Sequence, residues 1–76
     1  MTKKPYTTTE EIKQAFIKDG WSKNTSFTEL TVEEAEKRGM IYAVNEIKQG
    51  RKYFKMNVSG NIFNDKGKLI LFGFGK

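Results

Sequence analysis

The chain has 76 residues, of which 37% are hydrophobic, and its 14 basic and nine acidic side chains give a net charge of +5. It contains neither Cys nor His, which excludes disulfides and thiolate metal sites and removes the usual near-neutral general base. We therefore expect a non-enzymatic protein with no catalytic residue, no metal site and no cofactor.

The length of the chain limits the number of domains and the size of any cavity. A chain of this size forms a single domain, here residues 1–76, and buries only about 60% of the surface that it exposes when unfolded. An enclosed substrate cavity has little room, so we expect no small-molecule substrate. The longest apolar run, residues 69–72 (LILF), is too short to span a bilayer. The sequence predicts a cytoplasmic protein without a membrane partner.

Charge is distributed unevenly along the chain. Residues 1–36 carry five Lys and seven acids, a balance of −2, whereas residues 37–76 carry nine basic residues and two acids, a balance of +7. Such asymmetry is typical of a basic surface for an acidic partner. The alternative is that Lys serves solubility, since twelve Lys accompany only two Arg and Arg is the better bidentate phosphate donor.

The segment TTTEEIKQAFIKDGW, residues 7–21, predicts the first helix. Two overlapping capping boxes join Thr7 to Glu10 and Thr8 to Glu11, and an apolar face at helical spacing follows. Gly20 supplies a left-handed stop. The Trp21 that follows is expected to fold back on Phe16, so a structural role for this Trp is favoured over ligand stacking.

The segment LTVEEAEKRG, residues 30–39, predicts a second, short helix. Thr31 and Glu34 form a further capping box, and Gly39 ends the helix. Before it, the polar connection of residues 22–30 contains SFTEL, which could form a short edge strand.

From Met40 the pattern is interpreted as strands with a period of two. MIYAVNEIK and RKYFKMNVS flank Gln49-Gly50, which suggests a hairpin with a two-residue loop. This register places Phe54 on a core face and Tyr53 on the opposite face.

A second hairpin is expected at NDKG, residues 64–67, with Gly67 in the left-handed position. Pairing Phe63 with Lys68 directs Ile62 to the core face and Phe63 to the other face. A bulge at Ser59-Gly60-Asn61 would change that parity.

These elements predict an α+β domain, with two N-terminal helices packed on one face of an antiparallel sheet of three strands, or of four if SFTEL pairs. The other face would then combine aromatic and basic side chains. An exposed apolar patch of that kind normally marks an interaction site. The candidate binding residues on and beside this face are Tyr42, Lys48, Arg51, Lys52, Tyr53, Lys55, Lys66, Lys68, Phe72 and Phe74.

Two partners fit such a face. Single-stranded nucleic acid would stack its bases on Tyr42 and Tyr53 while the cations hold phosphates, and the basic half-chain favours this hypothesis narrowly. The alternative is a protein partner, since aromatic residues ringed by charge are typical of protein interfaces. The chain would then be a phage or mobile-element type of inhibitor or regulator acting on a host nucleic-acid-processing enzyme. A face closed against a homodimer mate, or against residues 22–30, remains a third interpretation.

Overall fold

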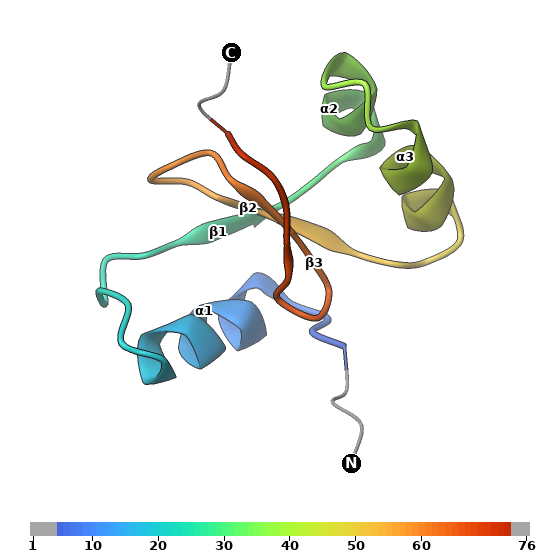
Figure 1. Cartoon of the computed structure of the whole chain (residues 1–76). Helices are drawn as coiled ribbons and strands as arrows, with labels where there is room; N and C mark the ends of the chain where they lie inside the picture. Colours follow the sequence, from blue (N-terminus) through green and yellow to red (C-terminus); the bar gives the residue numbers. More distant parts are fainter. Residues whose placement is uncertain (1–4, 74–76) are drawn as a thin grey trace.

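The computed structural model describes residues 5–73. Within these residues the chain forms an α+β domain with three helices and one antiparallel sheet of four strands in the order β1-β2-β3-β4. Its elements are α1 (Thr9–Lys18), β1 (Phe27–Glu29), α2 (Val32–Lys37), α3 (Ile41–Lys48), β2 (Tyr53–Met56), β3 (Ile62–Asn64) and β4 (Leu69–Leu71). Figure 1 shows α1 on one side of the sheet and the α2–α3 pair on the other.

The two predicted helices form where the sequence places them. Thr8 caps α1 by accepting a hydrogen bond from the backbone N–H of Glu11 at 3.2 Å, and the Glu11 carboxylate accepts from the N–H of Thr7. Thr31 caps α2 in the same way through the N–H of Glu34. Trp21 packs on Phe16 with ring centroids 5.6 Å apart. The predicted contact between these two rings is confirmed.

Residues 41–48 form a helix, so the predicted strand and its two-residue hairpin are wrong. Met40, Ala43 and Val44 are buried and Ile47 packs against them, which is the i, i+3, i+4, i+7 spacing of a helix face. Gly50, with φ +99°, lies just beyond the helix end. The N–H of Arg51 donates to the carbonyl of Glu46 at 2.9 Å, which completes the hydrogen-bond pattern of a glycine-terminated helix.

The segment SFTEL supplies the fourth strand. Phe27 of β1 lies opposite Met56 of β2, and Glu29 lies opposite Phe54. The first hairpin of the sheet is therefore β2–β3, which turns at residues 57–60 with Gly60 at φ +79°.

The conformation of this turn changes which side chains of β2 and β3 lie on the same face of the sheet, relative to the prediction. Phe54 lies directly opposite Phe63, so the two rings share a face, whereas the sequence pattern predicts opposite faces for them. The β3–β4 pairing also differs, because Phe63 lies opposite Leu69 instead of Lys68 and a bulge follows. The predicted turn at Asn64–Gly67 is present, with Gly67 at φ +81°.

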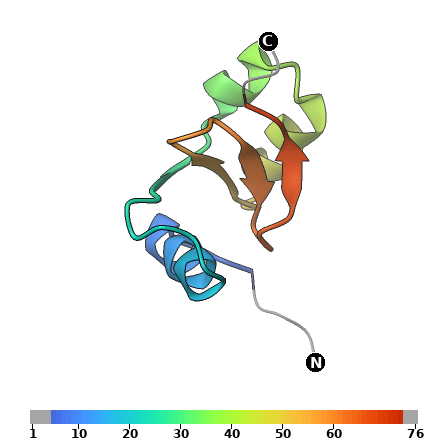
Figure 2. The ribbon, with the colours of Figure 1, turned by 60° about the vertical axis from the view of Figure 1, so that its left-hand side comes forward.

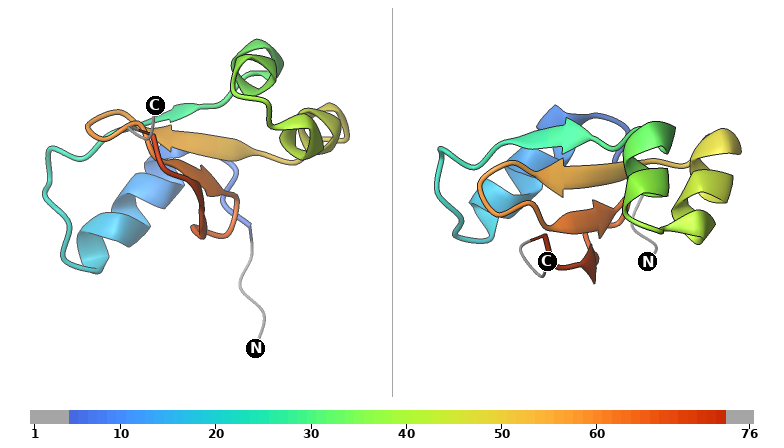
Figure 3. Two further views of the ribbon diagram at one scale, coloured as in Figure 1. Left: turned by 45° about the horizontal axis from the view of Figure 1, so that its top comes forward. Right: turned by 90° about the horizontal axis from the view of Figure 1, so that it is seen from above.

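Both faces of the sheet are covered, so the expectation that the helices share one face is wrong. Figure 3 (left) shows α1 on one side of the sheet and α2 and α3 on the other. An aromatic cluster fills the α1 side, and a mainly aliphatic cluster fills the α2–α3 side. The buried members of the first are Ile12, Phe27, Phe54, Met56 and Phe63. Those of the second are Leu30, Ala35, Met40, Ala43, Val44, Tyr53 and Ile62.

Within the described residues the outer strands of the sheet are β1 and β4, and Figure 2 shows β4 at one edge. No helix within residues 5–73 has both the length and the apolar character needed to cross a membrane.

Candidate functional site

The basic-aromatic sheet face expected from the sequence is closed. Tyr53 is only 4% exposed and Phe63 only 6%, because α3 covers the first and α1 the second. Neither ring can stack on a ligand while the domain is folded in this way. The candidate residues therefore do not form one continuous face.

Tyr53 belongs to a polar contact inside the α2–α3 side. Its hydroxyl donates to the Glu46 carboxylate of α3 at 2.6 Å. Burial, this hydrogen bond and the negative charge of Glu46 raise the pKa of the Tyr53 hydroxyl above its ordinary value. The hydroxyl stays protonated and fixes α3 to β2, so the role of Tyr53 in this fold is structural.

Two of the predicted cations are neutralised within the domain. Lys52 pairs with Glu29 at 2.9 Å, and Lys55 pairs with Glu34 at 3.5 Å. Burial opposes the ionisation of Glu34, but its hydrogen bonds and the charges of Lys55 and Arg38 outweigh that effect and lower its pKa. These lysines join β2 to β1 and to α2, and they contribute little positive charge toward a ligand.

Arg51 is held in a fixed orientation at the start of β2. Its Nε and Nη2 atoms donate to the two carboxylate oxygens of Asp65 at 2.8 and 3.0 Å. The hydrogen bonds and the charge of Arg51 lower the pKa of the buried Asp65 carboxyl, and the same pairing raises the pKa of Arg51. Two of the five guanidinium N–H donors are used, and the Arg51 side chain remains half-exposed.

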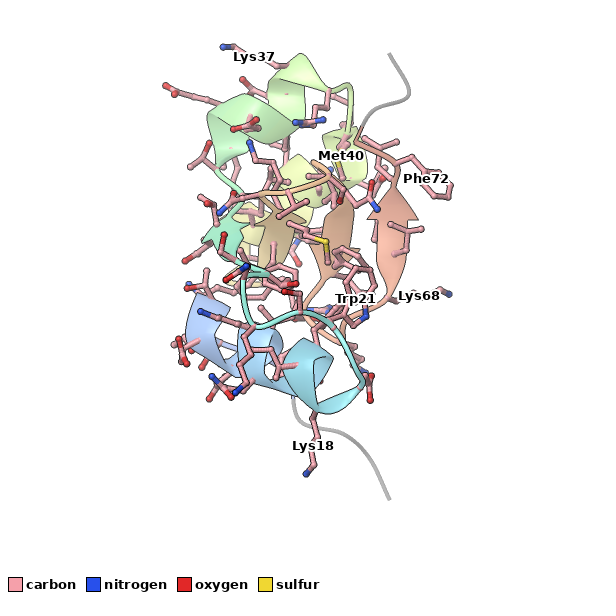
Figure 4. The ribbon with its side chains drawn as sticks, turned by 90° about the vertical axis from the view of Figure 1, so that its left-hand side faces the viewer. Lys18, Trp21, Lys37, Met40, Lys68 and Phe72 are labelled. Carbon is pink, nitrogen blue, oxygen red and sulfur yellow. The ribbon has the colours of Figure 1, made fainter. Side chains whose placement is uncertain are left out.

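Further exposed basic side chains lie on the segments that adjoin this pair along the chain. Lys66 follows Asp65 in the β3–β4 turn, Lys48 lies in the last turn of α3, and Lys68 projects away from the sheet at β4 (Figure 4). Half-exposed Tyr42 on α3 lies close enough to Tyr53 to influence its pKa. We call this set the Arg51 surface: Tyr42, Lys48, Arg51, Lys66 and Lys68.

The last candidates lie elsewhere. Phe72 follows β4 and is 61% exposed, projecting from the same edge as Lys68 (Figure 4). Phe74 lies outside the described residues.

The sequence favoured a structural role for Trp21 over ligand stacking; the ring does pack on Phe16, but it is also 47% exposed and lines a cleft of about 370 Å³. A signal for this was present in the sequence. The ring follows a helix-ending glycine and precedes the polar loop SKNTS, which leaves one side of the indole without an apolar neighbour from its own loop.

A larger hollow of about 610 Å³ lies beside the start of α1. It is lined by Pro5, the first described residue, and by the acidic side chains of Glu10 and Glu11. Its acidic wall is unsuited to phosphate. Within residues 5–73, no three acidic side chains converge as a metal site would require.

No protein-family model matches the sequence, and neither a curated protein nor a solved structure is significantly similar to it.

Proposed function

We propose that this protein is a non-enzymatic, cytoplasmic binding protein that holds single-stranded nucleic acid on the Arg51 surface. One observation carries the proposal. Lys48, Lys66 and Lys68 form no ion pair with any residue in the described part of the chain, whereas Lys52 and Lys55 are each paired with a carboxylate. Phosphates would therefore meet uncompensated positive charge at this end of the sheet.

The pairing with Asp65 balances the charge of Arg51, as Glu29 and Glu34 do for Lys52 and Lys55, so Arg51 would contribute oriented hydrogen-bond donors and the free lysines the net charge. Asp65 fixes two donors of the guanidinium, so less conformational entropy is lost when the remaining donors bind a phosphate oxygen. Tyr42 adds a half-exposed ring on which one base could stack, worth about 1–3 kcal/mol. Arg51, Lys48, Lys66 and Lys68 would contact the phosphate backbone of the nucleic acid, and Tyr42 would stack on a base.

Fluorescence anisotropy of a labelled single-stranded oligonucleotide tests this proposal. With at most four phosphate contacts, the logarithm of the affinity should fall with the logarithm of salt concentration with a slope of about −3 or shallower. The double reversal Lys66→Glu/Lys68→Glu should abolish binding at about 50 mM salt.

A matched control uses Lys18 and Lys37, which project from opposite ends of the molecule (Figure 4). The double variant Lys18→Glu/Lys37→Glu changes the net charge by the same amount but leaves the Arg51 surface intact. Equal loss of binding in both double variants would show that only net charge matters. No binding by the natural sequence at micromolar protein would overturn the proposal.

Contact with a protein partner is the second candidate function, in the form of an inhibitor or regulator of a host nucleic-acid-processing enzyme. The observation that favours it is the β4 edge, where Leu69 is 37% exposed and no further strand pairs with β4 within residues 5–73. Affinity capture from a nuclease-treated bacterial lysate tests it. A defined partner retained by the natural sequence and lost with Leu69→Lys would support it, whereas recovery that disappears on nuclease treatment would count against direct contact.

A further inference from the structure

The cleft beside Trp21 lies at the other end of β2 from Arg51. It is formed between the loop that follows α1 and the β2–β3 turn, with Trp21 and Thr25 on one side and Met56, Val58 and Asn61 on the other. Its volume of about 370 Å³ is within the range of small-ligand pockets. Figure 4 shows Trp21 between the end of α1 and the sheet.

Trp21 provides a rigid flat wall. Its backbone N–H donates to the carbonyl of Phe16 at 3.1 Å, and its ring is braced by the Phe16 ring at 5.6 Å. The indole is nevertheless 47% exposed, Met56 is buried below, and Val58 is 76% exposed at the rim. The contacts hold the indole in position while leaving part of its surface accessible.

Thr25 adds a polar group that lacks a partner. The residue is only 4% exposed and lines the cleft, yet within residues 5–73 its hydroxyl makes no hydrogen bond. The hydroxyl oxygen itself is not enclosed, so it can hydrogen-bond to the polar edge of a ligand in the cleft.

Asn61 provides oriented donors. Its Oδ1 accepts a hydrogen bond from the backbone N–H of Gly73 at 2.8 Å, which directs the amide nitrogen away from Gly73, and within residues 5–73 its two N–H donors form no hydrogen bond. Gly73 can approach only because it lacks a side chain, since a Cβ there would overlap the backbone of Gly60. The arrangement of Asn61 therefore depends on a close backbone contact.

Among the residues that the structure describes, the lining contains no charged side chain. A phosphate or carboxylate would lose hydration in the cleft without gaining a countercharge, so the occupant is neutral there. The flat indole favours a planar ring, and the Thr25 hydroxyl and the Asn61 amide require a ring with polar atoms at its edge. The exposed cation nearest in sequence is Lys23, in the same loop as Trp21.

We propose that this cleft binds a nucleobase, stacked on Trp21 and hydrogen-bonded at its edge by Thr25 and Asn61. The sugar and phosphate remain outside, on the side of solvent. The base can come from a free nucleotide or from a single strand. This site is separate from the Arg51 surface and does not depend on it.

Because Trp21 is the only Trp in the chain, its intrinsic fluorescence reports directly on the cleft. We expect saturable quenching when the protein is titrated with adenosine or uridine monophosphate, or with a short oligonucleotide, after correction with free N-acetyltryptophanamide. Saturation by the mononucleotides identifies a free-nucleotide site, and saturation by the oligonucleotide alone identifies a base within a strand. Quenching by neither overturns the inference.

Two variants of Thr25 form a matched pair that tests the hydroxyl separately from the shape of the side chain. Thr25→Val keeps the shape and removes the hydroxyl, and it should weaken binding about three- to tenfold without lowering the melting temperature, because the hydroxyl has no protein partner to lose. Thr25→Ser keeps the hydroxyl and should bind within about twofold of the natural sequence. Equal binding by Thr25→Val and Thr25→Ser would overturn the role of the hydroxyl.

Val58→Asp is a second test that does not depend on a buried position. Val58 is exposed, so the change should leave folding intact while its charge repels the phosphate at the rim and weakens binding about tenfold. Unchanged quenching would overturn the inference. The variant Lys66→Glu/Lys68→Glu should retain mononucleotide quenching, which distinguishes failure of this cleft from failure of the Arg51 surface.

Discussion

The two sides of the sheet are built from different chemistry. On the α1 side, the rings of Phe16, Phe27 and Phe63 meet edge to face with centroids 5.0 to 6.0 Å apart. On the α2–α3 side, aliphatic residues surround the Tyr53–Glu46 hydrogen bond, and Lys55 and Arg38 pair with Glu34. The comparison teaches that an alternating strand can have both of its faces buried, one against aromatic and one against aliphatic and polar partners.

The largest expected losses of stability test whether both faces of the sheet are buried. Phe54→Ala on the α1 side should lower the free energy of unfolding by about 3–5 kcal/mol, because it leaves a cavity among the rings. Tyr53→Ala on the α2–α3 side should cost a similar amount. Urea denaturation followed by circular dichroism measures both. A cost below about 0.5 kcal/mol for Tyr53→Ala, as at ordinary surface positions, would mean that this side is open.

Acid sensitivity should come from ion pairs and not from the aromatic cluster. The pKa of Asp65 is lowered by its hydrogen bonds to Arg51, so this carboxylate stabilises the fold above its unfolded pKa of 3.8. That contribution is lost as the pH falls through the lower folded-state pKa.

Asp65→Asn should therefore cost about 1.5–3 kcal/mol at pH 7 and show a shallower loss of stability on acidification. Denaturation at a series of pH values measures the difference. An unchanged pH dependence in the variant would assign the acid sensitivity to other carboxylates.

The Tyr53–Glu46 hydrogen bond on the α2–α3 side should make a smaller contribution to the free energy of unfolding. Tyr53→Phe removes the hydrogen bond to Glu46 and should cost about 1 kcal/mol. Tyr42→Phe is the matched control, because the Tyr42 side chain forms no hydrogen bond with the described residues, and it should cost almost nothing. Equal effects of the two changes would show that the Tyr53–Glu46 bond contributes nothing to stability.

The smallest expected effect concerns Glu34. Its two partners lie 3.4 and 3.5 Å away and all three side chains are partly exposed, so Glu34→Gln should cost about 0.5 kcal/mol at neutral pH. The lowered pKa of Glu34 makes this contribution disappear on acidification. Denaturation of the variant in low and high salt provides the check, since screening should reduce the difference.

The sequence predicted the α+β class, both N-terminal helices, the optional fourth strand and the β3–β4 turn. The strand predicted at residues 41–48 is wrong, because Met40, Ala43, Val44 and Ile47 have the spacing of one helix face. A local signal was available. Each helix ends with Lys, one residue and Gly, at residues 18–20, 37–39 and 48–50, and in each the residue after Gly donates back to the helix.

For the candidate site, the sequence correctly indicated which basic side chains are exposed, but it did not indicate which of them form ion pairs. Lys48, Arg51, Lys66 and Lys68 are exposed as expected, but nothing local indicated that Lys52 and Lys55 would find Glu29 and Glu34. Those pairs join residues more than 20 positions apart, and their formation depends on which strands become neighbours.

The sequence by itself determined the chemistry of the helix ends, the basic second half and the single Trp, because hydrogen bonds and spacing within a few residues fix such features. Only the tertiary structure decided that Tyr53 is buried and that Trp21 faces a neutral cleft. The parity of β3 depends on the conformation of four turn residues, and the burial of both sheet faces depends on α3 packing across β2. These are outcomes of long-range packing, which no short segment specifies alone.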